Sequence, residues 1–216
     1  MKIAVFGTGS VGETLGSKLI ELGHDVKMGS RTATNEKAAA WVKKAGAKAS
    51  TGTFADAAKG ADLIVNATLG TGTIEAFKMA GAENSAGKVV LDLSNPLDFS
   101  KGFPPSLFIS NTDSLGEALQ REFPKAKVVK ALNTMAATLM VNPRQLPDSH
   151  HTFIAGNDAG AKDLVKSLLL AFGWKAEEVI DVGDITGARA TESYLPIWLR
   201  LYGALKNGTF NVKIVR

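Results

Sequence analysis

Three glycines near the start of the chain, Gly7, Gly9 and Gly12, have the spacing G-x-G-x-x-G. They follow a short apolar run at residues 3–6 and precede a helical pattern, an order that predicts strand, tight turn and helix. In such a turn the first glycine permits the bend, the second lets backbone N–H groups approach a pyrophosphate, and the third lets the helix pack closely on the strand. The N-terminus of the helix attracts the anion through its unpaired N–H groups and its dipole. The motif therefore predicts a dinucleotide site.

A glycine-rich turn without a ligand is the alternative, because many proteins contain a lone G-x-G-x-x-G. The sequence that follows favours the nucleotide site. A predicted helix carries Leu15, Leu19 and Leu22 on one broad face, and a second predicted strand at residues 25–28 comes after it. The succession of strand, glycine turn, helix and strand is typical of the first half of a Rossmann domain.

The end of the second strand distinguishes the two nicotinamide dinucleotides. An NAD site has an Asp or Glu there, which accepts hydrogen bonds from the adenosine ribose, whereas this chain has Ser30 and Arg31. Asp25 is no substitute, because it lies at the other end of the strand, about 13 Å away at about 3.3 Å per residue. A guanidinium offers a planar fork of donors to a phosphate, and a serine adds a hydroxyl. The pair predicts NADP, although without the glycine turn Arg31 would be interpreted as a solvated loop cation.

The composition narrows the class of protein. With 216 residues, of which 45% are hydrophobic, the chain can form one large domain or a main domain with a small appendage. It has no cysteine, which excludes disulfides, thiolate chemistry and a Cys-ligated metal. The formal charge of +4 comes from basic residues scattered along the chain, and only 7% of residues are aromatic, so we expect no nucleic-acid partner.

The same sequence argues against a membrane protein. No apolar run reaches the roughly 18 residues that span a bilayer. The first predicted strand begins at the second residue, which leaves no room for a signal peptide. We therefore expect a cytoplasmic protein with no membrane partner.

Motifs for acid–base, nucleophilic or metal catalysis are missing. The chain has no G-x-S-x-G elbow, no H-E-x-x-H and no Walker A sequence. His150 and His151 are adjacent, so on a strand they would point to opposite faces. We therefore expect no metal site and no catalytic side chain.

Helical and strand patterns alternate along the chain, which predicts a parallel sheet with helices on both faces. Residues 98–112 lack periodicity and are expected to form a surface loop. The last predicted helix is more apolar than a one-sided surface helix requires, which indicates either core packing or a homodimer contact. The expected further helices are residues 34–45, 54–59, 74–82, 114–123, 159–172 and 188–205, and the expected further strands are residues 61–68, 88–93, 127–132, 152–155, 177–182 and 211–215.

Ligands of such a sheet bind at the edge where the parallel strands end. Two loops expected at this edge are a glycine-containing loop at residues 69–73 and a loop at residues 94–97. In the second loop Pro96 holds Asn95 out of the helical region. The Asn95 side chain then either points toward the cofactor or forms an Asx turn at the strand end.

The chain resembles the NADPH-dependent reductases of the deazaflavin coenzyme factor 420 over essentially its whole length. The segments that carry the resemblance are residues 7–12, 29–31, 130–137, 183–185 and 188–196. The segments at residues 130–137 and 188–196 are more specific than the glycine motif, which many unrelated dehydrogenases share. The resemblance implies an α/β fold of the Rossmann type, doubly wound and mainly parallel, with a small C-terminal α/β extension.

The resemblance also implies an NADP site in which the turn after the first strand binds the pyrophosphate and the Ser30–Arg31 pair binds the 2′-phosphate. Leu69, Thr71 and Ala137 are expected at the nicotinamide end. The residues expected to contact NADP are Gly7, Thr8, Gly9, Ser10, Val11, Gly12, Ser30, Arg31, Thr32, Asn35, Thr68, Leu69, Thr71, Asn95 and Ala137.

A flat hydride acceptor is implied above the nicotinamide, between residues 133–137 and the start of the last helix. Direct hydride transfer between two bound rings needs orientation and exclusion of water rather than a side-chain acid or base. We expect an NADP-binding domain at residues 1–141 and a segment for acceptor binding and dimerisation at residues 142–216. The residues expected to contact the acceptor are Asn133, Thr134, Met135, Ala136 and Arg189.

The chain departs from the characterised deazaflavin reductases at two places. They have a histidine at the position of Asn133, and bulky residues where this chain has residues 70–72. The acceptor is therefore factor 420, an ordinary flavin or another compound. Two further hypotheses are a small imine or carbonyl reductase, for which the chain after residue 142 is short, and a non-catalytic NADP-sensing protein.

Overall fold

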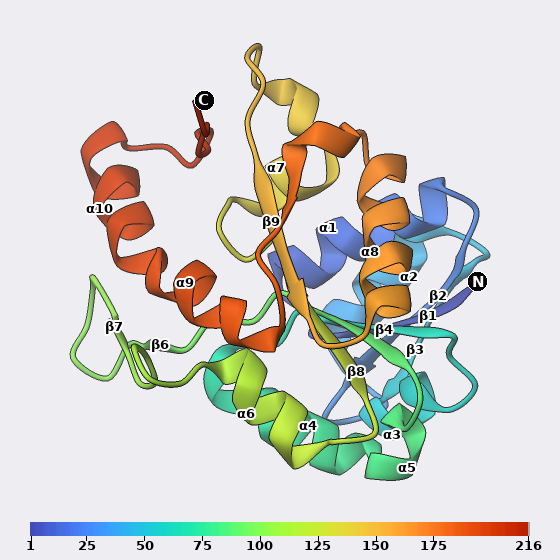
Figure 1. Ribbon diagram of the computed structural model, residues 1–216. Helices are drawn as coiled ribbons and strands as arrows, with labels where there is room; N and C mark the ends of the chain where they lie inside the picture. The colour runs from blue at the N-terminus through green and yellow to red at the C-terminus, as the bar shows by residue number, and fades with distance from the viewer. Residues whose placement is uncertain (216) are drawn as a thin grey trace.

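An eight-stranded sheet crosses the computed structural model, which describes residues 1–215 (Figure 1). The strand order is β10-β9-β8-β5-β4-β1-β2-β3, and every neighbouring pair is parallel except β8 and β9. This confirms the predicted doubly wound, mainly parallel fold. The strands are β1 (Lys2–Phe6), β2 (Asp25–Ser30), β3 (Ala49–Thr53), β4 (Leu63–Asn66), β5 (Val89–Asp92), β8 (Lys127–Ala131), β9 (Thr152–Gly156) and β10 (Val179–Asp181).

Helices cover both faces of the sheet because side chains alternate along each strand. On β1, Ile3 and Val5 belong to one buried cluster, whereas Ala4 and Phe6 belong to the other. The first cluster includes side chains of α1 (Ser10–Glu21), α2 (Glu36–Ala45), α7 (Ala137–Val141) and α8 (Ala159–Ala171). The second includes side chains of α3 (Phe54–Ala58), α4 (Thr73–Ala80) and α6 (Leu115–Glu122), which lie on the opposite side of the sheet in Figure 1.

The remaining short elements connect these layers. They are α5 (Ala82–Ser85) and the 3₁₀ helices η1 (Gly70–Gly72), η2 (Pro143–Gln145), η3 (Ala176–Glu178) and η4 (Ile185–Gly187). The predicted surface loop at residues 98–112 also contains a two-residue antiparallel pair, β6 (Leu97–Asp98) with β7 (Ser106–Leu107).

Several predictions of secondary structure were wrong or incomplete. The edge strand β3 was not predicted, because its sequence Ala-Ser-Thr-Gly-Thr lacks apolar alternation and it is held by backbone pairing with β2. The last helix is divided into α9 (Ala188–Ser193) and α10 (Leu195–Leu205), since Pro196 has no N–H to continue the ladder. Residues 211–215 form no strand, although the His151 N–H donates to the Val212 carbonyl at 2.8 Å.

The C-terminal part of the chain both continues the sheet and leaves it. Strand β9 pairs with β8, with Val129 opposite Gly156 and Lys130 opposite Ala155. Helices α9 and α10 then extend away from the sheet (Figure 1). The division at residue 142 therefore stays a prediction, and Arg216, the last residue of the predicted segment, lies outside the described residues.

Candidate cofactor and acceptor site

The turn between β1 and α1 has the geometry that its glycines predicted. Gly7 has a φ of +112°, and a side chain there would overlap the Ala67 carbonyl at the end of the neighbouring strand. A side chain at Gly12 would overlap the Gly7 carbonyl. Gly9 differs, because no atom lies within 4 Å of the place where its Cβ would be. Gly9 therefore faces the open space that a pyrophosphate needs.

Helix α1 begins directly at this open space. Gly9 is its N-cap residue, and within residues 1–215 no side chain caps the helix. Backbone N–H groups of the first turn of a helix have no intrahelical partner. The turn thus presents donors and the positive end of the helix dipole to an anion.

A cleft of about 570 Å³ opens beside this turn. We call it the cofactor cleft. Nine of the residues predicted to bind NADP line it, namely Gly7, Thr8, Gly9, Ser30, Arg31, Asn35, Thr68, Leu69 and Thr71. Six others are not among its lining residues, namely Ser10, Val11, Gly12, Thr32, Asn95 and Ala137.

Sequence reasoning missed part of the cofactor cleft. Its further lining residues are Phe54, Ala67, Gly72, Glu75, Ala76 and Met79. Residues 72, 75, 76 and 79 have the spacing of one helix face, and they follow directly on the predicted loop at residues 69–73. This spacing was the available signal for a wall formed by α4.

The rim of the cofactor cleft carries the predicted NADP-selective residues. Arg31 is exposed, whereas Ser30 is 5% exposed and its hydroxyl donates to the Thr32 carbonyl. The Asn35 side chain accepts a hydrogen bond from the Ala38 N–H at 3.0 Å and so caps α2. Arg31 is therefore the cation of this rim, and the hydroxyl proton of Ser30 is already used.

The loop after β4 forms the opposite wall. The Thr68 hydroxyl donates to the Asn66 side-chain oxygen at 2.7 Å and lies 2.9 Å from the Thr73 hydroxyl. The Leu69 side chain is 60% exposed. A side chain at Gly70 would overlap the Asn95 carbonyl, so this loop lies closely against the loop after β5.

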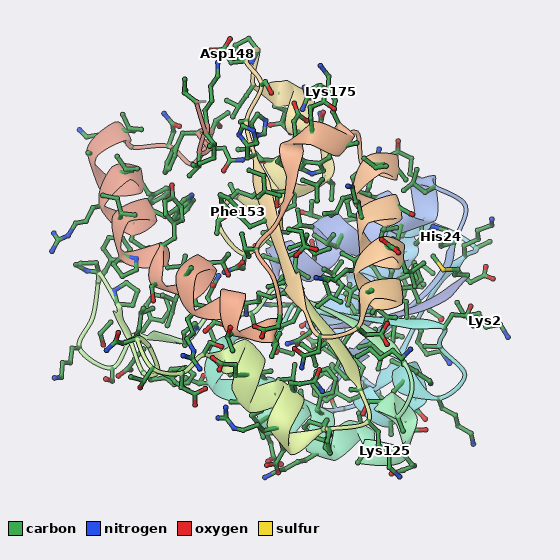
Figure 2. All side chains as sticks on the ribbon, in the orientation of Figure 1. Lys2, His24, Lys125, Asp148, Phe153 and Lys175 are labelled. Carbon is green, nitrogen blue, oxygen red and sulfur yellow. The ribbon has the colours of Figure 1, made fainter. Side chains whose placement is uncertain are left out.

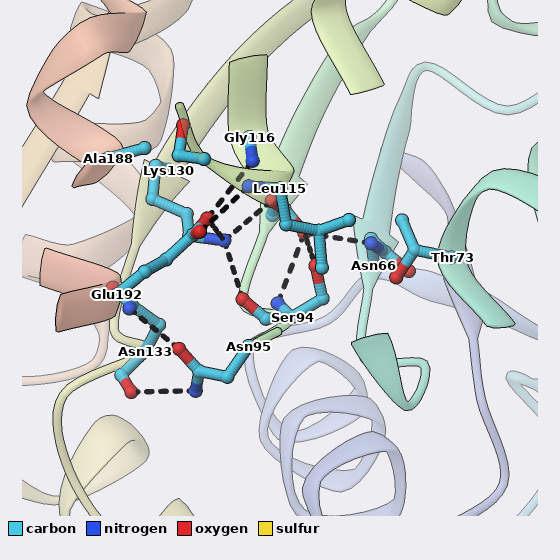
Figure 3. Close-up of polar contacts among 12 residues, drawn as sticks. Asn66, Thr73, Ser94, Asn95, Leu115, Gly116, Lys130, Asn133, Ala188 and Glu192 are labelled. Atoms are coloured by element: carbon cyan, nitrogen blue, oxygen red, sulfur yellow. Dashed lines mark hydrogen bonds and ion pairs between the residues drawn. The ribbon is translucent and has the colours of Figure 1, made fainter. Parts of the chain in front are cut away.

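The Asn95 side chain binds Asn133 in place of the Asx turn considered from its sequence. Its side-chain N–H donates to the Asn133 carbonyl at 3.0 Å, and the Asn133 side-chain N–H donates to the Asn95 side-chain oxygen at 2.9 Å (Figure 3). Asn133 lies 38 residues after Asn95 in the sequence, so no local pattern indicates this pair. The two asparagines tie the loops after β5 and β8 together.

Most of the residues predicted to contact the acceptor are buried. Asn133 and Thr134 are each 2% exposed, and Met135 is 6% exposed. The side-chain oxygens of Asn133 and Thr134 have no hydrogen-bond partner within residues 1–215. Ala136 is half-buried, and Gly208 of the C-terminal tail lies against it. Residues 133–137 therefore contain two buried side-chain oxygens that form no hydrogen bond within the described residues.

Arg189 lies on α9, where the Glu117 carboxylate of α6 holds its guanidinium. The Arg189 Nε donates to the Glu117 Oε2 at 2.8 Å, and a second N–H donates to the other carboxylate oxygen. The Arg189 hydrogen bonds outweigh burial and lower the pKa of Glu117 below its ordinary value. The Arg189 side chain is 40% exposed, and the Glu117 carboxylate occupies one edge of its guanidinium.

A buried cluster of charges, which no sequence motif indicated, lies behind the two loops. The Lys130 ammonium is 2.8 Å from an Asp92 oxygen and 2.7 Å from a Glu192 oxygen, and all three side chains are at most 2% exposed (Figure 3). The one available signal was a lysine inside the otherwise apolar strand sequence Val-Val-Lys-Ala.

Residues 1–215 contain no group of three or more His, Asp or Glu side chains that could hold a metal ion. No helix within them combines the length and apolar character that crossing a bilayer requires. Lys2, Lys125 and Lys175 lie at separate edges of the view in Figure 2.

Comparison with known proteins shows which proteins this chain is similar to. A family described as NADP oxidoreductases, coenzyme F420-dependent, matches residues 2–96. The crystal structure of a proposed F420-dependent NADP-reductase from Arthrobacter sp. FB24 is 50% identical, with a TM-score of 0.94, and the match covers 100% of both chains.

More distant relatives share part of the chain or the fold alone. The metalloreductase STEAP3 of Rattus norvegicus is 27% identical over 202 residues, which are 91% of this chain and 38% of that protein. The chain thus spans about two fifths of the length of this curated relative. An imine reductase from Myxococcus stipitatus has a TM-score of 0.62 at 17% identity, covering 95% of this chain and 63% of that one, and shows a common fold.

Proposed function

Because the chain belongs to the family of coenzyme F420-dependent NADP oxidoreductases, we propose that it transfers hydride between NADP(H) and a flavin-like acceptor. The acceptor is a deazaflavin coenzyme or a flavin. The cofactor cleft carries this proposal, because it brings the glycine turn, the Arg31 rim and the loop after β4 to one place.

The residues of the cofactor cleft fit the chemistry of NADP. The open space at Gly9 and the uncapped start of α1 suit the pyrophosphate. Exposed Arg31 suits the 2′-phosphate, since a guanidinium binds phosphate through several donors at once. Leu69 and Thr71 are proposed at the nicotinamide end, where they exclude water from the reacting carbon.

The bound cofactor supplies the hydride, and the protein orients the two rings. No side-chain acid or base is assigned, because direct hydride transfer needs none. The proposed role of the residues 133–137 is to border the acceptor. Flavins and deazaflavins carry ring N–H donors, which suit the unpaired oxygens of Asn133 and Thr134. The free edge of Arg189 is proposed to face an anionic group of the acceptor.

A second copy of the chain is the proposed partner of α10. Ile197, Tyr202 and Leu205 of this helix are 51%, 43% and 51% exposed, and only Leu195 and Leu199 are buried. An apolar helix of this kind is typical of a subunit contact. Light scattering of the purified protein tests this, with a dimer expected and a monomer at all concentrations contradicting it.

Turnover assays test the proposed function. NADPH is mixed with coenzyme F420, FMN, FAD and riboflavin in turn, and the loss of NADPH absorbance is followed. We expect oxidation with at least one of these acceptors and much slower oxidation of NADH. Tight NADPH binding without oxidation by any of them would contradict the proposal and favour an NADP-sensing protein, whereas turnover of a cyclic imine alone would favour an imine reductase.

A further inference from the structure

Lys130 is a charged side chain at the centre of the protein. It lies on β8, and its side chain is 0% exposed. An ammonium has three N–H donors, and here they meet the Asp92 carboxylate, the Glu192 carboxylate and the Ser94 carbonyl. Burial lowers the pKa of Lys130, but the two carboxylates outweigh burial and raise this pKa above its ordinary value. The side chain is therefore a permanent cation.

The Asp92 carboxylate connects Lys130 to the cofactor cleft. Its Oδ1 accepts from the Asn66 side-chain N–H at 2.7 Å, so the Asn66 amide oxygen points the other way. That oxygen accepts from the Thr68 hydroxyl at 2.7 Å, and Thr68 lines the cofactor cleft. The orientation of this wall of the cleft is thus set by a chain of hydrogen bonds that begins at Lys130. Figure 3 shows this chain as far as Asn66.

The Glu192 carboxylate connects Lys130 to α9. Its two oxygens also accept from the backbone N–H groups of Leu115 and Gly116, at 2.7 and 3.0 Å, which are the first residues of α6. One carboxylate thereby joins α9, α6 and β8. Two carboxylates share one ammonium, and the positive end of the α6 dipole offsets part of the remaining negative charge.

We propose that Lys130 is a positioning residue, which holds the Thr68 wall of the cofactor cleft and helix α9 at a set separation. The inference rests on the proposed function, in which the nicotinamide lies at that wall and the acceptor lies beside α9. Lys130 is not among the lining residues of the cofactor cleft, so it acts through Asp92 and Glu192. Hydride transfer depends steeply on the distance between the reacting atoms, and a misplacement of about 1 Å can cost about 100-fold in rate.

The alternative is that the cluster only stabilises the fold, and two variants distinguish the roles. Lys130→Met leaves two carboxylates buried without their shared cation, which lowers stability. Lys130→Met with Glu192→Gln removes one of these two negative charges and so restores the net charge of the original cluster, so part of the lost stability returns. The link from Lys130 to α9 is absent in both variants.

The experiment compares three measurements for each variant: the thermal unfolding midpoint, the dissociation constant of NADPH and the single-turnover rate of hydride transfer. We expect the NADPH dissociation constant to change by less than about threefold, because Lys130 is not among the residues that line the cofactor cleft. We expect the rate to fall about 10- to 100-fold in both variants. In the double variant the midpoint should recover while the rate should not.

The matched control is Lys127→Met. Lys127 lies on the same strand, but its ion pair with Asp158 is at the surface, where the two side chains are 44% and 36% exposed. We expect the rate and the midpoint of this variant to stay close to those of the unmodified protein, because exposed ion pairs contribute little. If the rate of hydride transfer recovers together with the unfolding midpoint in the double variant, the inference is overturned. If Lys130→Met does not fold, the rate of the double variant is compared directly with that of the unmodified protein.

A readout without turnover separates this inference from the proposed function. The fluorescence of bound NADPH reports the surroundings of the nicotinamide and needs no acceptor. If the unmodified protein oxidises NADPH with none of the acceptors, the proposed function fails, and the inference is decided by this fluorescence. A changed emission in the double variant supports it, and an emission equal to that of the unmodified protein overturns it.

Discussion

The two sides of the candidate site differ in the chemical groups that form them. On the cofactor side, backbone groups around Gly9 and the exposed cation of Arg31 face an open cleft of about 570 Å³. On the acceptor side, which we define as residues 133–137 with α9, buried polar side chains bind one another. The cofactor side therefore depends on backbone groups of one short turn and a nearby cation, whereas the acceptor side depends on pairs that join distant segments.

The largest expected effect is on the acceptor side. Glu192→Leu should lower the free energy of unfolding by about 3–5 kcal/mol, because it removes one of the two carboxylates that bind the buried Lys130 and leaves two α6 N–H groups without their partner. Urea unfolding measures this. Glu122→Leu is the control, since Glu122 forms an exposed ion pair with Lys78 at 3.3 Å and should cost less than about 1 kcal/mol. Equal losses in the two variants would contradict the importance of the buried cluster.

A backbone change on the cofactor side should come next. Gly7→Ala should lower the free energy of unfolding by about 2–4 kcal/mol, because the positive φ and the overlap with the Ala67 carbonyl both oppose a side chain. Gly9→Ala sharpens the comparison. Its backbone is extended and its Cβ would meet nothing, so stability should stay while NADPH binding weakens. If Gly9→Ala binds NADPH normally, the pyrophosphate does not approach this turn.

A side-chain change at the rim should have a moderate effect on binding alone. Arg31→Ala should weaken NADPH binding by about 1–3 kcal/mol, the range for a charged hydrogen bond, with little effect on NADH. Titration calorimetry with both cofactors measures the difference. Arg200→Ala, at an exposed arginine of α10, serves as the control. An equal loss for NADPH and NADH would show that Arg31 has a structural role.

The smallest expected effect is a pH dependence of the acceptor side. Arg189 lowers the pKa of Glu117 below its ordinary value of 4.5, so the folded state keeps this carboxylate ionised where the unfolded state takes up a proton. This contribution to stability is complete above 4.5 and is lost as the pH falls through the lower, folded pKa. Urea midpoints measured over this acidic range should fall less steeply for Glu117→Gln than for the unmodified protein. Parallel curves would contradict a role for this carboxylate.

Much of the fold could be predicted because its signals are local. The apolar run of β1, the glycine turn and the helix face of α1 lie within 20 residues of one another. The helix predicted at residues 34–45 corresponds to α2, which Asn35 caps and Gly46 ends, because capping depends on adjacent residues. The edge strand β3 was not predicted, because the backbone hydrogen bonds to its partner β2 leave no apolar pattern in its sequence.

The same holds for the candidate site: the part with local sequence signals could be predicted, and the part formed by distant residues could not. The pattern of Gly7, Gly9 and Arg31 indicated a place where phosphate binds, and these residues line one cleft. The pairing of Asn95 with Asn133 and the occupation of Arg189 by Glu117 had no sequence signal, because the partners are 38 and 72 residues apart. Sequence reasoning therefore located the acceptor segments without their internal contacts.

The sequence by itself determined the order of elements and the chemistry of the cofactor side, because a glycine turn and a cation at a strand end act through their own backbone and charge. Only the tertiary structure decided how Lys130 is used. A lysine in an apolar strand is costly unless carboxylates reach it, and Asp92 and Glu192 reach it only once β5, β8 and α9 have packed together.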